Sequence, residues 1–535
     1  MTRLWSAPRR NRPPYTLPAP PTDKEKYWYM GRQHRWLLVA QALSFSLIAW
    51  SIARFATADT RLLLFLLPMS LYTVTLIVSL ASNGRKKRIS LLDHDLRVLE
   101  YAPAWHPAID VFLPTAGEPL EVLRNTYTHV SKLEWPGPLR VLVLDDGVRA
   151  DVRQLAERFG FEYSTRPDAG RLKKAGNLRF GYEQSDGEII AIFDADFVPR
   201  PDYLSELIPY FAEPDVGIVQ SPQFFDAKPG MHWFRRCAGA TQELFYRWIQ
   251  PARDRSRAAI CVGTCALYRR SALVDAGGFA QIGHSEDVHT GVNLMKAGYY
   301  VRYVPIIVSK GLCPDTLGGF LNQQYRWCTG AMSLLANQSF HAADQISFRQ
   351  RACFWSGFLY YISTALNAFM APLPALAMLY LLPQWIEPMN SIWLLGALCL
   401  WFVILPSVMK GHWRIDVLRV QLMYSYAHAV AILHLLTGRT REWVATGSTS
   451  GKATPVAVTI RRTMQIYVGA TQVLIYVGLV RGTLTYGFSE YWAMIGLAVL
   501  GAYVHLPLLF MSLGTAKSRR PRTDPRPAIA PPANA

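Results

Sequence analysis

Cysteine is scarce in this chain, whose 535 residues contain only seven. The seven are Cys237, Cys261, Cys265, Cys313, Cys328, Cys353 and Cys399. Their number is odd, and no two of them form a Cys-x-x-Cys pair. Zinc sites and redox pairs use that spacing, and disulfide frameworks use even sets in oxidising compartments. The sequence therefore predicts reduced thiols in a cytosolic compartment.

Acidic residues are also few, 38 against 56 Lys and Arg, which gives a formal net charge of +18. Residues 1–35 are polar, basic and rich in Pro, without an apolar core, so we expect no signal peptide. The positive charges gather in the connections between apolar runs, which is a pattern of membrane topology. We therefore expect no nucleic-acid partner.

Charge is nearly absent from six apolar runs, in which much of the 51% hydrophobic content is concentrated. The runs cover residues 36–53, 62–82, 355–381, 391–409, 464–480 and 491–512. Most are close to the ~20 residues that cross a bilayer. The sequence predicts six spans, two each in 36–82, 354–409 and 463–512. Pro372 and Pro374 predict a tilt or kink in the third.

Lys and Arg are distributed unequally between the two sides that six spans define. Residues 1–35, 83–107, 410–463 and 513–535 hold eight, five, eight and five, whereas 54–61, 382–390 and 481–490 hold two, none and one. Basic connections stay on the cytoplasmic side. We therefore expect a multi-pass protein of the inner (plasma) membrane with both termini and the segment 107–345 in the cytoplasm.

Residues 107–345 have the composition of a soluble domain. Strand-like runs at 109–115, 140–147, 188–196 and 216–225 alternate with helical segments. Such alternation predicts an α/β domain with a mostly parallel, buried sheet. Acidic residues end two of these runs, where open α/β sheets place their ligands.

The segment 413–452 follows the fourth run. Its first part, 413–436, is apolar but interrupted by Arg, Asp and His, which favours a helix along the membrane interface. A seventh span is the alternative, and it would place the basic C-terminus outside. The loop up to 452 is rich in Gly, Ser and Thr and can move. We expect residues 1–35 to be disordered and 513–535 to form a basic, Pro-rich tail.

Two strand ends carry carboxylates. Asp194 and Asp196 end the run 188–196, and such a pair can hold a hard divalent cation that neutralises a diphosphate. Asp145, before Asp146-Gly147, could accept hydrogen bonds from a base or ribose. Each signal is weak alone, because surface Asp-x-Asp triplets and acidic strand-to-turn exits are common.

Two further charged residues suit catalysis on a sugar phosphate. Asp287 in Ser285-Glu286-Asp287 is a candidate general base, although the same triplet could simply cap the helix that follows, with Ser285 or Glu286 as the cap. Lys174 could reach a phosphate, although it could equally begin an ordinary basic helix.

The stretch FLNQQYRWCTGAM, from Phe320 to Met332, predicts a helix. Gln323, Arg326 and Trp327 stand at i, i+3 and i+4, so they share one face. A guanidinium suits phosphate oxygens and a flat ring suits a sugar face. An amphipathic surface helix with a half-buried Trp is the plainer interpretation of this motif by itself.

The order of the motifs is more specific than any of them. Asp-Asp-Gly, Lys-Ala-Gly-Asn, Asp-Ala-Asp, Glu-Asp and Gln-x-x-Arg-Trp follow one another inside one α/β domain flanked by spans. With PTAGE (114–118), VQSPQFF (219–225), QELFYRWIQPARD (242–254) and CVGTCALYRR (261–270), this chain resembles the processive, membrane-embedded inverting glycosyltransferases of the cellulose, curdlan and hyaluronan synthase superfamily. The run 242–254 is most similar to bacterial cellulose synthase catalytic subunits. The resemblance implies a GT-A-like domain inserted between the spans.

For the donor, the resemblance implies that Thr115, Glu118 and Asp145 hold uridine. Lys174 and Thr446 would contact the diphosphate, the latter from WVATG (443–447), which resembles a gating loop. That loop departs from the family pattern in Trp443 and Gly447.

For the reaction, the resemblance implies Mg²⁺ or Mn²⁺ at Asp196 and Asp194. Asp287 would deprotonate the acceptor hydroxyl, and Arg326 would stabilise the leaving diphosphate.

For the acceptor, it implies Trp327 and Gln323, with Cys261, Gly263 and Thr264 lining the pocket. The implied partners are UDP-glucose, the growing polysaccharide, the bilayer, and accessory export or regulatory subunits.

The family allows more than one product. A β-glucan like cellulose is the first expectation, and β-1,3- or mixed-linkage glucan, hyaluronan, chitin or a glycolipid are alternatives. A catalytically dead transporter or scaffold is a remote one, because it would have no need of these carboxylates. The chain has two spans before the domain where those cellulose synthases have four. Neither 410–463 nor 513–535 has room for a cyclic-dinucleotide receptor domain, so regulation of that kind would need another subunit.

Overall fold

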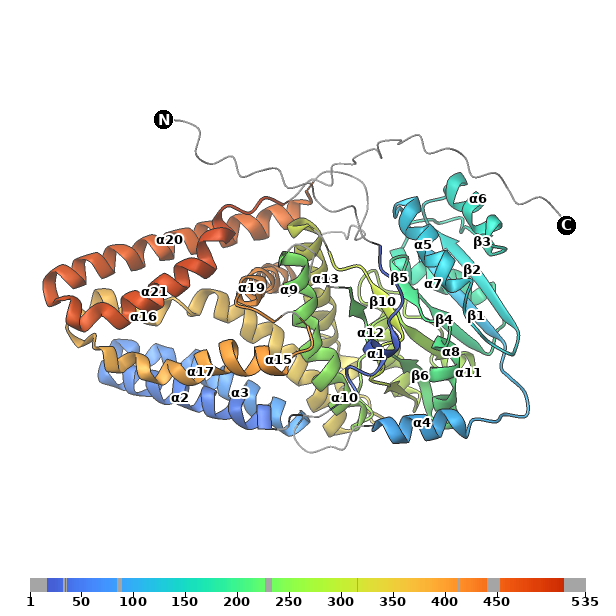
Figure 1. The fold of residues 1–535 in the computed structure, drawn as a ribbon, viewed down its shortest axis with the longest axis horizontal. Coiled ribbons are helices and arrows are strands. Elements are labelled where there is room, and N and C mark those ends of the chain that lie inside the picture. Colours follow the sequence, from blue (N-terminus) through green and yellow to red (C-terminus); the bar gives the residue numbers. More distant parts are fainter. Residues whose placement is uncertain are drawn as a thin grey trace.

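The computed structural model has two parts, an α/β domain and a bundle of apolar helices, which lie end to end (Figure 1). It describes residues 17–31, 34, 36–83, 89–226, 233–314, 316–411, 413–439 and 453–513. The α/β domain is inserted between the second and third helices of the bundle, as the sequence predicts.

A seven-stranded sheet forms the centre of the α/β domain, in the order β3-β2-β1-β4-β8-β6-β9. The strands are β1 (Ile109–Thr115), β2 (Leu139–Asp145), β3 (Glu162–Ser164), β4 (Ile189–Ile192), β6 (Val216–Gln220), β8 (Ala266–Arg269) and β9 (Tyr300–Tyr303). All neighbours pair in parallel except β8, which is antiparallel to both β4 and β6. The predicted mostly parallel sheet is therefore confirmed.

The strands read as continuous apolar runs because both faces of the sheet are covered. Every residue of β1, β4 and β6 is buried, and separate apolar clusters lie on the two faces. The helices α5 (Leu120–Val130), α6 (Ala150–Arg158) and α7 (Lys173–Glu183) follow β1, β2 and β3. β4 ends at Ile192, earlier than the predicted run, so Asp194 and Asp196 lie in the turn beyond the strand.

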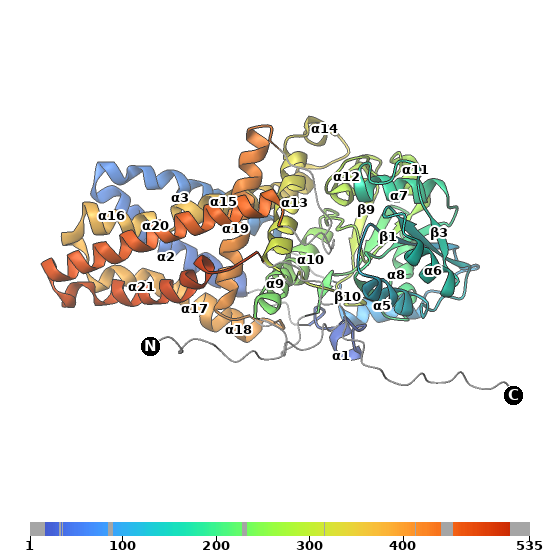
Figure 2. The ribbon, with the colours of Figure 1, turned by 90° about the horizontal axis from the view of Figure 1, so that it is seen from above.

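Short elements connect the sheet to the bundle. A three-stranded sheet consists of β5 (Phe197–Pro199), β10 (Ser309–Gly311) and β7 (Phe224–Phe225). The helices are α8 (Tyr203–Leu207), α9 (Trp233–Leu244), α10 (Gln250–Asp254), α11 (Arg270–Asp275), α12 (Glu286–Lys296), α13 (Leu317–Leu335) and α14 (Gln338–His341). Of these, α9 and α13 lie between the sheet and the bundle (Figures 1 and 2).

Six helices are long and apolar enough to cross a membrane, which confirms the predicted number. They are Trp36–Thr57, Thr60–Ser82, Phe348–Leu381, Pro388–Val408, Pro455–Tyr486 and Phe488–Leu509. The third is divided into α15 (Phe348–Met370) and α16 (Leu373–Leu381), with Pro372 at the start of α16. The chain is thus an integral membrane protein, and the predicted proline kink is where Pro372 prevents a continuous helix.

The spans are arranged as a closed ring. Contacts run from α2 (Trp36–Ala58) to α3 (Leu66–Asn83), α15, α16, α20 (Pro455–Tyr486) and α21 (Phe488–Leu509), then through η5 (Pro388–Leu394) and α17 (Leu395–Cys399) back to α2. A ring of helices can enclose a path through the membrane.

The helix α19 (Asp416–Leu436) is not one of the six. It packs on α9, α13 and α15, and it runs across the direction of the bundle (Figure 2). This placement is consistent with the predicted interfacial helix and not with a seventh span in the ring.

A buried ion pair fixes α9 to the end of the fourth span. Glu243 accepts hydrogen bonds from the Arg247 guanidinium (2.7 Å) and from the backbone N–H groups of Lys410 (2.8 Å) and Gly411 (2.6 Å). Arg247 also donates to the Val408 carbonyl (2.9 Å), and Glu243 and Arg247 are 3% and 2% exposed.

Glu243→Ala is expected to destabilise the protein by ~3–5 kcal/mol, because it removes the countercharge of a buried guanidinium and the acceptor of two backbone amides. A lower midpoint of thermal unfolding in detergent would show this. Glu243→Gln keeps one oxygen acceptor and should cost less; an unchanged midpoint for Glu243→Ala would contradict the prediction.

Candidate active site

The candidate site lies at the carboxyl edge of the sheet. Thr115 and Asp145 are partners in the register of β1 and β2 and form the last residues of both strands. Asp194 follows the neighbouring strand β4 by two residues. The edge therefore brings the predicted donor residues together, as parallel strands require.

Glu118 organises the turn after β1. Its carboxylate accepts hydrogen bonds from the Thr115 hydroxyl (2.7 Å) and from the backbone N–H groups of Ala116 (2.8 Å) and Gly117 (3.1 Å). Gly117 has φ of +139°, which favours glycine. Thr115 and Glu118 thus form one ordered loop, and their contact with uridine stays a prediction.

Asp145 is fully buried, with 0% exposure. Its carboxylate accepts from the backbone N–H groups of Gly147 and Arg149 (both 2.8 Å) and from the Tyr163 hydroxyl (2.9 Å). These bonds hold the strand-to-turn exit, which is the plainer of the two interpretations. A nucleotide that donates to Asp145 would have to share the carboxylate with these three donors. The binding of uridine by Asp145 stays a prediction.

Lys174, at the start of α7, joins three parts of the site. Its ammonium donates to the Asp194 carboxylate and to the Gly263 carbonyl (2.8 Å), and it lies 4.0 Å from the Glu286 carboxylate. Burial favours the neutral amine, but Asp194 and Glu286 raise the pKa of Lys174 overall. The lysine is therefore a fixed positive charge at the site.

The Asp194-Ala195-Asp196 turn is held by two hydroxyls. Thr264 accepts a hydrogen bond from the Asp194 N–H (2.9 Å), and Thr126 donates to the Ala195 carbonyl (2.7 Å). Thr264 is buried. Its direct role is thus to position Asp194, whereas contact with an acceptor stays a prediction.

Asp196 lies in a region of negative electrostatic potential. Burial, then the charges of Asp194 and Glu118, raise its pKa to about 7. Among the described residues no cluster of three or more His, Cys, Asp or Glu could hold a metal ion. Mg²⁺ binds through one or two carboxylates, with substrate phosphates and water completing its shell, and a divalent cation would offset this potential. Asp194 and Asp196 therefore fit such a cation.

Asp287 lies in the first turn of α12. Burial first, and the charge of Glu286 second, raise its pKa to about 7, partly opposed by Lys174. Gly263 packs closely on it, since a Cβ at Gly263 would be 2.9 Å from the Asp287 Cβ and Oδ2. A carboxylate with a pKa near neutrality suits a general base.

The start of α12 differs in one respect from the prediction. The helix begins at Glu286 as expected, but Ser285 adopts φ of +52° and makes no capping hydrogen bond with its side chain. Its hydroxyl faces Gly330 of α13 instead: a Cβ at Gly330 would be 1.7 Å from the Ser285 Oγ and 2.3 Å from its Cβ. Ser285 therefore stands at the N-cap position, as one of the two expected cap residues, but its side chain does not cap the helix because it fills the contact between the two helices.

The helix α13 presents Arg326 to the carboxylates. Burial lowers the pKa of Arg326 to about 10, and the charges that oppose this are those of Glu286, Asp194, Asp287 and Asp196, in that order. Its guanidinium thus lies within electrostatic range of all four. Arg326 of the motif therefore lies near these carboxylates, and its contact with a diphosphate stays a prediction.

Trp327 and Asp287 line one cavity of about 1650 Å³, together with Cys261. Gln324 lines it as well, whereas Gln323 is not among its lining residues. Gln324 is only 4% exposed. The face of α13 that meets the cavity therefore carries Gln324 in place of the Gln323 that helical spacing suggests.

Several contacts were beyond the reach of sequence reasoning. Glu286 acts on Lys174, Arg326 and Asp287 at once, and Gly330 allows α13 to approach α12. The position of Glu286 next to the predicted base Asp287 was a sequence signal for its role, whereas nothing in the sequence singled out Gly330. Thr446 lies outside the described residues.

A family model for glycosyl transferase family group 2 matches residues 189–410. A cellulose synthase catalytic subunit (UDP-forming) of Pseudomonas fluorescens is 34% identical over 269 residues, which are 49% of this chain and 36% of that protein. Its counterpart from Xanthomonas axonopodis is 31% identical over 260 residues, 48% and 36%. The chain thus matches about a third of the length of these relatives.

A solved structure, a mannosyltransferase of Pyrobaculum calidifontis in complex with GDP-mannose and Mn²⁺, is 18% identical with a TM-score of 0.42, covering 68% of this chain and 99% of the other. A TM-score this low does not establish a common fold. The family match, the two relatives and the six apolar helices agree with a glycosyltransferase domain in a membrane protein. The chain contains a glycosyltransferase domain of family group 2.

Proposed function

We propose that the protein transfers glucose from UDP-glucose to the end of a growing β-glucan, with inversion at the anomeric carbon. The observation that carries this proposal is the convergence of Asp194, Asp196, Lys174 and Arg326 around Asp287, which lines the cavity that continues between the spans. The positive charges of Lys174 and Arg326 suit a diphosphate leaving group, and the carboxylate of Asp287 suits a general base. The likeness to cellulose synthase catalytic subunits supports the choice of donor.

In the proposed reaction Asp287 accepts the proton of the acceptor hydroxyl. The hydroxyl oxygen attacks the anomeric carbon of the donor in line, a new glycosidic bond forms, and the bond to the β-phosphate oxygen breaks. UDP leaves with the electron pair, and Asp287 later returns the proton to water. One displacement of this kind inverts the anomeric configuration.

Lys174 and Arg326 are placed to stabilise the charge that grows on the diphosphate. A divalent cation, Mg²⁺ or Mn²⁺, would be held by Asp196 and Asp194 and would supply further neutralisation of the diphosphate. Trp327 would stack on the acceptor sugar, because its ring lines the cavity beside Asp287.

The cavity supports transport of the product. It extends from Asp287 and Trp327 between the six spans to Trp385 and Glu387 beyond α16. A chain elongated at Asp287 could enter it directly. We place the α/β domain and both termini in the cytoplasm and the bundle in the inner membrane, on the distribution of Lys and Arg.

Purified protein incubated separately with UDP-glucose, UDP-GlcNAc and UDP-glucuronate, each with Mg²⁺ or Mn²⁺, tests the donor. Incorporation from UDP-glucose and a product digested by a β-1,4-specific glucanase are expected. Digestion only by β-1,3- or mixed-linkage glucanases would show that the product has that linkage instead. Incorporation only from another donor would overturn the proposal.

The acid limb of the pH profile tests the base. Asp287 works only when ionised, so kcat/KM should fall as the pH is lowered through its raised pKa, which lies about 7 without bound donor and cation. Glu286→Gln removes the like charge that helps raise this pKa. The acid limb should therefore shift to lower pH in the variant. An acid limb at the same pH in both proteins would show that the pH dependence does not come from Asp287.

A further inference from the structure

A segment that precedes the first span is fastened to the α/β domain. It covers residues 17–31, which we call the strap, and contains the short helix α1 (Asp23–Lys26) (Figure 1). The Lys26 ammonium donates to the Asp202 carboxylate (2.9 Å) and lies 2.7 Å from the Glu206 carboxylate. Lys26 is buried. Separating a buried ammonium from its partners is strongly destabilising, so these contacts hold the strap in one place.

The strap covers one face of the small sheet β5-β10-β7. That face carries Lys310 of β10 and Phe224 of β7, which are partners in the strand register. The Lys310 ammonium lies 2.6 Å from the Glu25 carboxylate of α1, and Lys310 is 4% exposed. The rings of Trp28 and Tyr29 lie edge-on to the Phe224 ring, with 6.0 and 5.9 Å between centroids. A buried ion pair and an aromatic contact thus join the strap to this sheet.

The opposite face of the small sheet packs toward the helices of the bundle side. Phe197 of β5 and Phe225 of β7 belong to the apolar cluster that includes residues of α9 and α13. Gly311 of β10 lies opposite Phe197, where a Cβ would be 2.4 Å from the Phe197 ring. The small sheet is therefore held between the strap on one face and a packed apolar cluster on the other.

The small sheet begins at the turn that we propose for the cation. β5 starts at Phe197, directly after Asp196, and the Phe197 N–H donates to the Asp194 carbonyl (3.0 Å). Just beyond β5, the Arg200 guanidinium donates to the Pro21 carbonyl of the strap (2.7 Å). A single short strand therefore connects the turn to a residue that the strap binds.

The helix α5 provides a second connection between the strap and the turn. The Asn125 amide donates to the Pro18 carbonyl of the strap (2.9 Å). The next residue, Thr126, donates from its hydroxyl to the Ala195 carbonyl in the turn (2.7 Å). Two adjacent residues of one helix thus contact the strap and the turn.

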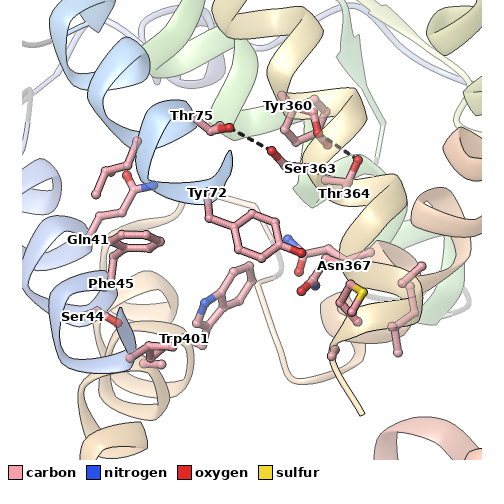
Figure 3. A pocket seen from close by; sticks show the side chains of 18 of the residues that line it. Gln41, Ser44, Phe45, Tyr72, Thr75, Tyr360, Ser363, Thr364, Asn367 and Trp401 are labelled. Carbon is pink, nitrogen blue, oxygen red and sulfur yellow. Dashed lines mark hydrogen bonds between the residues drawn. The ribbon is translucent and has the colours of Figure 1, made fainter. Parts of the chain in front are cut away.

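The strap also leads into the wall of the cavity. It ends at Gly31, and the first span begins at Trp36. Gln41, Ser44 and Phe45 of this span line the cavity (Figure 3). The strap is therefore a direct link along the chain between the cavity wall and the domain that carries the turn.

We propose that the strap positions the turn Asp194–Asp196 for its divalent cation, with the Glu25–Lys310 pair as the fastening. This inference rests on the proposed function and adds positioning residues that lie outside the site. A turn that adopts the binding geometry in only a fraction of the molecules binds its cation more weakly in proportion to that fraction, whereas saturating cation restores the geometry. Loss of the fastening should therefore weaken cation binding and leave the maximal rate nearly unchanged.

The test measures Mn²⁺ binding to the full chain in detergent with UDP, by the paramagnetic resonance signal of free Mn²⁺. Glu25→Ala and Lys310→Met each break the pair, and each should raise the Mn²⁺ concentration for half-saturation about tenfold, as for other residues that support metal ligands. The double variant should also show an increase of about tenfold, because both changes remove one interaction. Lys310→Met leaves no ammonium buried without a partner, so it decides the test if Glu25→Ala does not fold. Lys24→Met is the matched control, because Lys24 is on α1 but exposed.

Two further measurements separate positioning from a general role in folding. Without cation, amide hydrogen exchange in residues 193–198 should be faster in Glu25→Ala and Lys310→Met, whereas exchange in β1 should be unchanged. With saturating Mn²⁺ and UDP-glucose, kcat should stay within about threefold of the unmodified protein, because bound cation restores the turn.

Unchanged Mn²⁺ binding in both single variants would overturn the inference. Faster exchange throughout the α/β domain would also overturn it, as would increases that multiply in the double variant. If the unmodified protein binds Mn²⁺ with UDP but transfers no glucose, the proposed function fails, and weaker Mn²⁺ binding in the variants still supports the strap. If the unmodified protein binds no Mn²⁺ with UDP, the role of Asp194 and Asp196 fails, and the inference about the strap with it.

Discussion

Asp287→Asn is expected to lower the rate of sugar transfer by about 10²–10⁴-fold, the usual contribution of a general base. The amide is nearly isosteric but cannot accept the proton of the acceptor hydroxyl. Its neighbours Gly263 and Val288 should keep their positions, since the replacement keeps the number of non-hydrogen atoms in this close contact. UDP release and incorporation of labelled glucose measure the loss.

Two controls separate this effect from misfolding. Asp186→Asn alters a carboxylate that is 95% exposed and remote from the cavity, and it should transfer at the normal rate. Donor binding to Asp287→Asn, measured by calorimetry, should be close to that of the unchanged protein, because the base contacts the acceptor. Transfer at the normal rate by Asp287→Asn would show that the assigned base is wrong.

Gly330→Ala is expected to lower transfer by about 100-fold, through the contact between α12 and α13. The added Cβ would lie 1.7 Å from the Ser285 Oγ and 2.3 Å from the Ser285 Cβ. The hydroxyl can rotate away but the Cβ cannot, so one helix must move. Asp287 stands on α12, and Arg326 and Trp327 stand on α13. A displacement of about 1 Å between reacting groups costs on the order of 10²-fold in rate.

Ser285→Gly provides the rescue. It removes both clashing atoms, and glycine accepts the positive φ of +52° at this position. The double variant Ser285→Gly/Gly330→Ala should recover most of the activity lost by Gly330→Ala. Alanine is a better helix former than glycine, so a lower helix propensity cannot explain the loss. A single variant with normal activity, or a double variant no better than the single, would contradict the prediction.

Local patterns determined much of this protein. The apolar runs fix six spans, because about 20 uncharged residues can leave water only as a membrane helix. The alternating runs determine the parallel strands, because a strand buried on both faces needs apolar residues throughout. The carboxyl ends of neighbouring strands then bring Thr115, Asp145 and Asp194 to one edge, whatever the loops between them do.

Tertiary structure alone decided which atoms meet. Helical spacing puts both Gln323 and Gln324 near the face of Trp327, and only the packing of α13 on α12 and α19 decides that Gln324 lines the cavity. The contact of Gly330 with Ser285 depends on how closely two helices pack, which no local pattern encodes. The cavity is lined by residues of α2 and of α21, which lie more than 400 positions apart in the sequence and come together only in the ring of spans. Sequence periodicity sets the faces of each element, whereas the packing of several elements sets the site.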